Sequence, residues 1–315
     1  MNKVLRAISE IGIVPVISID DAANAVPLAR ALVAGGLPAA EVTFRTSAAE
    51  DTIRIMTAEV PEMLVGAGTV LTPEQLDRAL EAGAQFIVSP GFNPDMVRYG
   101  LSKGALMIPG TATGGEMEQA MAMGLEAVKF FPAEQNGGLA KLKALAGPYQ
   151  TLKWMPTGGI SASNVASYLS LPQVAACGGT WMAAKELIAG EKWGEITALC
   201  KQAVKTMLGF SLAHVGVNCS HAAEAEKTAQ TLCALFGLEY RPGNGSVFAG
   251  NAVECMKTPG LGKNGHIAIL TNSLDRAVCH LKRQGIEFNE STHTSKAIYL
   301  KNEIGGFAVH LLQKS

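Results

Sequence analysis

Short apolar runs alternate with longer stretches of helical period over about the first 200 residues of the chain. Apolar runs of this length predict buried strands, and the stretches between them predict helices. Thr72-Pro73 and Asn93-Pro94 indicate two helix starts, each with a capping side chain followed by proline. Eight runs fit the strand pattern, at residues 13–17, 41–44, 64–67, 86–88, 106–108, 127–130, 153–155 and 174–177.

Eight strand-helix units in so short a span predict an α/β fold, a compact (β/α)8 TIM barrel. An open, doubly wound parallel sheet is the alternative. It is the weaker interpretation because no Gly-x-Gly-x-x-Gly motif follows the first strand.

The pattern changes after Gly209, which follows a helix-like stretch at 193–207. A strand, a helix and two short strands are predicted at 213–217, 222–235, 246–249 and 252–256. A similar series follows at 267–270, 273–284, 296–300 and 307–312. The repeat predicts an α+β domain of two strand-helix-strands units. We therefore expect one domain at residues 1–209 and a second at 210–315.

Composition excludes several classes of protein. The 315 residues are 48% hydrophobic with a net charge of −1, which argues against disorder and against a polybasic nucleic-acid binder. No apolar run reaches about 18 residues, so we expect no membrane span. The 6 cysteines show no CxxC spacing and the start lacks a signal-peptide core, so we expect reduced thiols and a cytoplasmic location.

All 6 histidines lie at or after His214. The first domain therefore cannot use imidazole as a base or a metal ligand. Its proton chemistry must rely on carboxylates, lysines or hydroxyls.

Lys129 is the one charge inside an apolar predicted strand. Alternation of side chains places it on the inner face, at the mouth of a barrel. A lysine amine removed from water gives up its proton more readily and can form a Schiff base with a carbonyl compound. The alternative is a lysine that extends to the rim and binds substrate as a plain cation, and the local pattern does not decide between them.

Glu41, Thr43 and Arg45 share the inner face of another strand by the same alternation. Glu41 is the nearest candidate for a base, and the Arg45 guanidinium suits a substrate carboxylate. The alternative is that Glu41 and Arg45 form a buried structural ion pair.

Two glycine pairs, Gly158-Gly159 and Gly178-Gly179, follow the last two predicted strands and precede helical segments. Backbone N–H groups there can converge on an anion, and these loops form the usual phosphate site of a barrel.

Six motifs of the first domain resemble, in order, those of the 2-keto-3-deoxy-6-phosphogluconate (KDPG) and 4-hydroxy-2-oxoglutarate (KHG) aldolase family. The resemblance covers about residues 1–208 and implies a class I aldolase that needs no metal or other cofactor and forms a homotrimer. Thr180 replaces a common serine and Phe44 a common leucine. The motifs are EVTFRT (41–46), GAGTV (66–70), IVSPG (87–91), VKFFPAE (128–134), PTGGIS (156–161) and GGTW (178–181).

The resemblance implies that Lys129 forms the Schiff base and that Glu41 transfers protons. Two small-molecule substrates remain open: KDPG, cleaved to pyruvate and glyceraldehyde 3-phosphate, and KHG, cleaved to pyruvate and glyoxylate. The glycine-rich loops favour the phosphorylated one. The implied roles are carboxylate binding by Arg45 and Thr69, site walls from Pro90 and Phe131, and phosphate binding by Gly158, Gly159, Gly179 and Thr180.

The second domain resembles the vicinal-oxygen-chelate superfamily, which includes glyoxalase I and bleomycin-resistance proteins. The resemblance implies an α+β domain of paired βαβββ modules. Each module opens with a strand histidine and closes with a polar residue inside an apolar strand. The resemblance implies that His214, Glu254, His266 and His310 bind a divalent Zn, Fe, Ni, Mn or Co ion. His310 replaces the usual glutamate, which leaves the metal and its chemistry open.

Three alternatives remain. In the first, the second domain binds no metal and serves binding, packing or solubility. In the second, it carries its own activity on an oxo-acid or aldehyde. In the third, the barrel is a non-catalytic protein that binds a sugar phosphate. The presence of Glu41, Arg45 and Lys129 together argues against this alternative.

Overall fold

The computed structural model describes residues 1–314 and divides into two compact units, Met1–Met207 and Leu208–Ser315. The division falls within two residues of Gly209, where the change of pattern lies. No helix of the described chain has the length and hydrophobicity that a membrane span requires.

The first unit is a closed ring of parallel strands, as predicted. Only Pro109 separates β5 from β6, so these two short strands together occupy one strand position of the ring. Bridges Trp154↔Val174 and Thr157↔Gly178 join β8 to the segment that contains β9, and β9 pairs with β1. The strands are β1 (Ile13–Ile17), β2 (Ala39–Thr43), β3 (Leu64–Gly68), β4 (Ile87–Val88), β5 (Met107–Ile108), β6 (Gly110–Thr111), β7 (Ala127–Phe130), β8 (Lys153–Pro156) and β9 (Cys177–Gly179).

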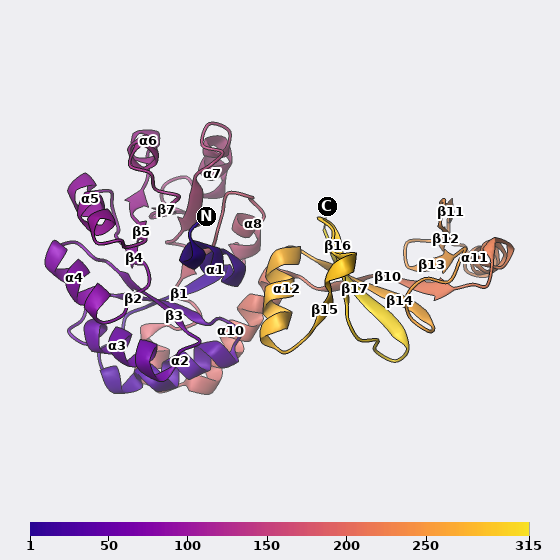
Figure 1. The fold of residues 1–315 in the computed structure, drawn as a ribbon, viewed down its shortest axis with the longest axis horizontal. Coiled ribbons are helices and arrows are strands. Elements are labelled where there is room, and N and C mark those ends of the chain that lie inside the picture. The colour runs from indigo at the N-terminus through magenta and orange to yellow at the C-terminus, as the bar shows by residue number, and fades with distance from the viewer. Residues whose placement is uncertain (315) are drawn as a thin grey trace. The chain divides into compact units, whose positions relative to one another are not determined.

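Helices surround these strands (Figure 1). Both predicted starts are confirmed: Thr72 accepts a hydrogen bond from the Gln75 amide, and Asn93 caps the next helix. The helices are α1 (Lys3–Ile11), α2 (Ala25–Ala34), α3 (Ala49–Glu59), α4 (Pro73–Glu81), α5 (Pro94–Ser102), α6 (Gly114–Ala122), α7 (Gly138–Ala146), α8 (Val165–Leu169), α9 (Lys185–Ala189) and α10 (Trp193–Leu208), with a 3-10 turn at Ala22–Asn24.

The last strand of the ring differs from its prediction. It spans Cys177–Gly179, so the glycine pair lies in the strand and not in a loop after it. The reason is close packing: a Cβ on Gly178 would lie 2.3 Å from the Thr157 hydroxyl, and one on Gly179 would lie 1.8 Å from the Trp181 ring. Only glycine allows the strand to pass these side chains.

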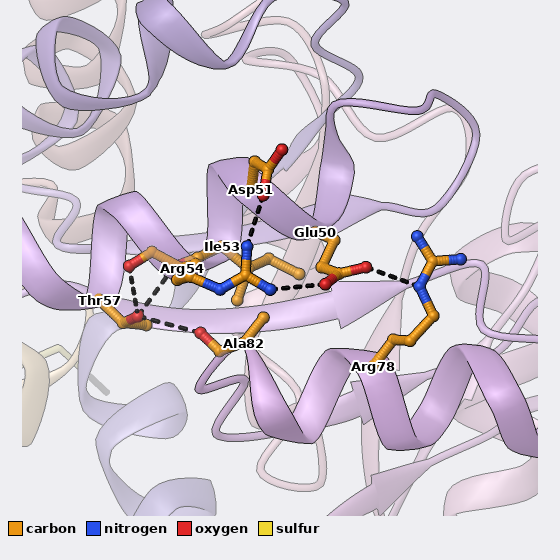
Figure 2. A network of polar contacts seen from close by, with 7 residues as sticks. All are labelled: Glu50, Asp51, Ile53, Arg54, Thr57, Arg78 and Ala82. Atoms are coloured by element: carbon orange, nitrogen blue, oxygen red, sulfur yellow. Dashed lines mark hydrogen bonds and ion pairs between the residues drawn. The ribbon is translucent and has the colours of Figure 1, made fainter.

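Charged side chains connect α3 to α4 outside the ring (Figure 2). Glu50 accepts hydrogen bonds from Arg54 on its own helix at 2.5 Å and from Arg78 on α4 at 2.6 Å. Arg54 also contacts Asp51. The network fixes α3 and α4 to each other through Glu50.

The second unit is one sheet built from two βαβββ modules, as predicted. Strands β10 and β14, the first of each module, pair antiparallel at the centre, and each pairs in parallel with the last strand of its own module. From residue 211 to residue 313 the strand order is β11-β12-β13-β10-β14-β17-β16-β15. The elements are β10 (Ser211–Asn218), α11 (Ala222–Phe236), β11 (Tyr240–Pro242), β12 (Ser246–Ala249), β13 (Val253–Met256), β14 (Gly265–Thr271), α12 (Leu274–Arg283), β15 (Phe288–Asn289), a 3-10 turn (Glu290–Thr292), β16 (Ala297–Leu300) and β17 (Phe307–Gln313).

Two strands of this sheet, β11 and β15, have no counterpart among the predicted runs. Both are short edge strands, and β11 contains Pro242, which cannot donate to a ladder. They lack the apolar run that identifies a buried strand.

Replacing Glu50 by glutamine tests the network of Figure 2. Hydrogen bonds from Arg78 and Arg54 hold the pKa of Glu50 below its ordinary value. Its charge therefore contributes stability above the unfolded-state pKa, and this contribution is lost as pH falls through the folded-state pKa. We expect E50Q to lower the free energy of unfolding by at most about 1 kcal/mol at neutral pH, with a smaller difference from the parent at about pH 3, where part of the charge is lost.

Urea unfolding at the two pH values measures the effect, with the exposed Glu62→Gln as the control. A loss of the same size at both pH values would contradict the assignment.

Candidate functional site

Lys129 on β7 and Glu41 on β2 meet inside the ring. The Lys129 amine (Nζ) lies 3.0 Å from Oε1 of Glu41, and the two side chains are 6% and 1% exposed. Lys129 is therefore not the rim lysine of the alternative interpretation, because its charge does not reach solvent. Across the ring interior, an amine and a carboxylate lie in direct contact.

A glycine makes room for this pair. Gly68 ends β3, which runs beside β2, and a Cβ on Gly68 would lie 2.3 Å from Oε1 of Glu41. Among residues 1–314, Oε2 of Glu41 has no hydrogen-bond partner. One carboxylate oxygen holds the lysine, and the other is free to accept a proton from a bound molecule.

The position of Arg45 contradicts two predictions. Strand β2 ends at Thr43, so Arg45 lies in the following turn and is exposed, not on the inner face of the strand. The buried ion pair of Glu41 is with Lys129, so the predicted alternative of a structural Glu41–Arg45 pair is wrong. The alternation pattern failed because the strand ends at Thr43, one residue before the end of the predicted run, and the chain turns there.

Arg45 nevertheless contacts another predicted site residue. Its Nε donates to the Thr69 hydroxyl at 3.2 Å. Thr69 has φ 57, in the left-handed region that a threonine rarely adopts. Such a backbone outlier just beyond a barrel strand supports a hypothesis of function for Thr69.

Phe131 borders the lysine, and Pro90 lies against the strand residue that pairs with Lys129. Gly110 pairs with Lys129, and a Cβ on Gly110 would lie 2.1 Å from the carbonyl oxygen of Pro90. The Lys129 amine lies 5.1 Å from the centre of the Phe131 ring. Both residues are half-buried.

The two glycine pairs come together at the next strand ends. Thr157 bridges to Gly178, which brings the loop after β8 beside β9. Gly158 and Gly159 have φ 96 and 77, a conformation that favours glycine. Thr180 is exposed immediately after β9.

Helix ends do not account for an anion site at these glycines. The segments that follow them, α8 and α9, have 5 residues each. Backbone N–H groups of the loops themselves are the groups that an anion would meet there.

In the second unit the four predicted ligands lie on one face of the sheet, in two equivalent rows that cross the strands. Paired residues in neighbouring strands share a face. The first row is Arg241, Phe248, Glu254, Gly216 and His266, and the second is Asn289, Tyr299, His310, Ala268 and His214.

The ligand atoms of this cluster converge. Nε2 of His214 and Nε2 of His266 are 3.1 Å apart, and they lie 3.0 and 3.1 Å from Oε2 of Glu254. The ring nitrogens of His214, His266 and His310 lie within 4.8 Å of one another. Two ligands at about 2.0–2.2 Å from one tetrahedral ion are separated by about 3.3–3.6 Å, so a small outward shift of these side chains would let them share a cation.

Two electrostatic features support a cation here. Burial raises the pKa of Glu254, but hydrogen bonds from His214, His266 and Ser246 outweigh this effect and hold the pKa well below its usual range. Burial, together with His266 and His214, lowers the pKa of His310 to about 4. Nε2 of His310 is buried without a hydrogen-bond partner among residues 1–314, so a neutral imidazole offers a lone pair to the cluster.

Several residues of this centre were absent from the sequence prediction. Gly216 is required because a Cβ there would lie 2.0 Å from Cε1 of His266. Phe248 packs edge-on against His214, and Tyr299 lies with its ring centre 4.4 Å from that of His310. Equivalent spacing within the two modules was the signal that could have identified all three.

The family model for KDPG and KHG aldolase matches residues 4–199. A 2-dehydro-3-deoxy-phosphogluconate aldolase of Treponema pallidum is 46% identical over 205 residues, which are 65% of this chain and 98% of that protein. A KHG/KDPG aldolase of Escherichia coli is 45% identical over 193 residues, 61% of this chain and 91% of its own length.

A solved structure extends the comparison. The crystal structure of a KDPG aldolase from Legionella pneumophila, with pyruvate captured as a covalent carbinolamine intermediate, is similar with a TM-score of 0.61 and 40% identity. The match covers 63% of this chain and 97% of that one.

Replacing Glu41 by alanine tests the buried ion pair. Removing one partner of such a pair leaves an uncompensated buried charge, so we expect a loss of about 3–5 kcal/mol in the free energy of unfolding. Asp20→Ala is the control, because its bridge to Lys185 is exposed on both sides and should contribute less than about 1 kcal/mol.

Urea unfolding of both variants gives the comparison. The double variant Glu41→Leu/Lys129→Met should recover much of the loss, since it removes both charges. Equal losses for the two single variants would contradict the pairing.

Proposed function

This chain belongs to the KDPG and KHG aldolase family, and we propose that its barrel cleaves 2-keto-3-deoxy-6-phosphogluconate to pyruvate and glyceraldehyde 3-phosphate through a Schiff base on Lys129. The observation that carries the proposal is the buried contact of Lys129 with Glu41 at 3.0 Å. A silent sugar-phosphate binding protein would have no use for a desolvated amine beside a carboxylate, which costs stability.

The chemistry follows from this contact. Lys129 in its neutral form attacks the C2 ketone, and Glu41 passes protons so that the carbinolamine loses water. The iminium that results accepts the electron pair of the C3–C4 bond, while the C4 hydroxyl loses its proton to Glu41, directly or through water. The aldehyde leaves, an enamine of pyruvate is protonated at C3, and hydrolysis returns the amine.

Four residues around the amine would bind the pyruvate half. We assign the carboxylate to the Arg45 guanidinium and the Thr69 hydroxyl, which already contact each other. Pro90 and Phe131 would cover the reacting carbons. Because the imine is the electron sink, the bond cleavage itself requires no metal or other cofactor.

The loop at Gly158 and Gly159, together with Gly179 and Thr180, would bind the phosphate. Positive φ at both loop glycines allows their backbone N–H groups to face an anion. This feature favours the phosphorylated substrate over 4-hydroxy-2-oxoglutarate, which remains the second substrate of the proposal.

We also propose a homotrimer in the cytoplasm. The resemblance to the family supports the trimer, and the exposed apolar side chains of Leu71 (54%) and Leu101 (39%) are positions on the first unit that a contact between copies would cover. All six cysteines are free thiols, which suits a reducing compartment.

Borohydride reduction in the presence of pyruvate tests the Schiff base. We expect a reduced pyruvate adduct on the peptide that contains Lys129, and none in Lys129→Met. Lys153→Met is the matched control, because its amine contacts only a surface carbonyl among the described residues, and it should still form the adduct. Glu41→Gln should slow KDPG cleavage by about 10²–10⁴-fold. An adduct on another lysine in the parent protein would reject the assignment.

A second candidate function concerns the second unit. We propose that His214, Glu254, His266 and His310 bind one divalent transition metal, as in the vicinal-oxygen-chelate superfamily. The observation in its favour is the convergence of three ring nitrogens within 4.8 Å beside a carboxylate. The ion would supply a Lewis acid for an oxo-acid or aldehyde; a role in binding or packing without metal is the alternative.

Metal titration of the full chain tests this second function. We expect one Zn²⁺ or Co²⁺ per chain by calorimetry, and a loss of more than about tenfold in affinity for His214→Ala or His310→Ala. His293→Ala, at an exposed histidine outside the cluster, should bind as the parent does.

Two glycine variants sharpen the test. Gly216→Ala should weaken binding because its Cβ displaces the His266 ring, whereas Gly245→Ala meets nothing within 4 Å and should not. Unchanged stoichiometry and affinity in His214→Ala would exclude the site.

A further inference from the structure

Glu134 and Tyr168 form a polar contact that the mechanism does not use. Glu134 follows β7 in the loop before α7, and Tyr168 lies on α8, the helix after the proposed phosphate loop. The Tyr168 ring is 1% exposed, and its hydroxyl donates to Oε1 of Glu134. A buried phenol therefore ties together the segments on either side of the Gly158-Gly159 loop.

The backbone repeats this connection. The Ala133 amide donates to the Thr157 carbonyl at 2.7 Å, and the Glu134 amide donates to the Gly158 carbonyl at 3.1 Å. The loop after β7 and the loop after β8 are thus joined by two hydrogen bonds at the glycine pair. A shift of Glu134 must move Gly158.

The Glu134 side chain also lies against the second glycine. A Cβ on Gly159 would lie 2.5 Å from Cγ of Glu134, and one on Gly158 would lie 3.1 Å from Cα of Pro132. The two positive-φ glycines therefore rest on residues 132–134. Their N–H directions depend on where the Glu134 side chain is held.

Because Glu134 carries a negative charge, its position affects the binding of an anion at the neighbouring loop. A carboxylate beside a loop that binds a phosphate dianion repels the ligand unless another group holds it away. Burial and the Glu134 carboxylate raise the pKa of Tyr168 well above its ordinary value, so the phenol stays a proton donor at neutral pH.

We propose that Glu134 and Tyr168 are positioning residues that set the preference of the aldolase for a phosphorylated 2-oxo acid over one without phosphate. Tyr168 holds the Glu134 carboxylate against the underside of Gly159, which fixes the loop N–H groups toward the phosphate and keeps the negative charge away from it. The inference rests on the proposed function, since it assigns the phosphate to this loop.

Steady-state kinetics of the full chain with KDPG and with KHG tests the inference. Tyr168→Phe removes only the hydroxyl, and we expect KM for KDPG to rise by about tenfold, with kcat for KDPG and both constants for KHG within about twofold of the parent. Glu134→Ala should behave in the same way. Glu134→Gln keeps an oxygen that accepts from Tyr168, so it should retain most of the preference for KDPG.

Tyr149→Phe is the matched control. Tyr149 donates to Glu118 at 3.1 Å in an exposed pair of the same type, so its loss should leave the ratio of the two specificity constants unchanged. Equal losses for both substrates in Tyr168→Phe, or an unchanged ratio, would overturn the inference.

The variant Gly159→Ala distinguishes two outcomes: that Glu134 and Tyr168 do not position the loop, and that the loop does not bind the phosphate. Its Cβ is strained at φ 77 and collides with Glu134, so it should raise KM for KDPG alone if the loop binds phosphate. A selective effect in Gly159→Ala without one in Tyr168→Phe would refute the positioning role and leave the phosphate loop intact. No selective effect in either variant would refute both.

Discussion

The ion pair of Lys129 and Glu41 constrains the architecture of the first unit. Its residues belong to β7 and β2, which are not neighbours in the ring, so they can meet only across a closed interior. Removing two charges from water costs several kcal/mol per ion, and the mutual contact must offset this cost. The strands that close the ring therefore do more than bury apolar side chains, because they bring an amine and a carboxylate within 3.0 Å of each other.

Both units make room for a functional side chain in the same way. In the barrel, Gly68 of the neighbouring strand leaves space for Glu41, and in the second unit Gly216 leaves space for the His266 ring. Any β-carbon at either position would collide with the functional group itself. Close packing of functional groups against adjacent strands therefore restricts these backbone positions to glycine, although Gly68 and Gly216 lie outside the left-handed region.

Much of this arrangement could be predicted from the sequence, because buried strands, capped helices and a repeated module have local signatures. The eight runs of the barrel and the caps at Thr72 and Asn93 are of this kind. The partner of Glu41 could not be found locally, since Lys129 is 88 residues away and alternation suggested Arg45. Strand ends were also uncertain. The turn after Thr43 moved Arg45 to the surface, and close contact with Thr157 and Trp181 placed the glycine pair inside β9.

The second unit shows what duplication of a module does and does not supply. Its two rows place Glu254 opposite Gly216 and His310 opposite Ala268, so the backbone provides two equivalent positions for a ligand. The side chains then break the symmetry. The carboxylate of Glu254 accepts from His214, His266 and Ser246, whereas Nε2 of His310 has no such partner within residues 1–314. Hydrogen-bond donors therefore surround the side chain at one of the two equivalent positions, and a ring nitrogen without a partner lies at the other. Duplication of the module thus supplies equivalent backbone positions, whereas the side chains at those positions differ in their hydrogen bonding.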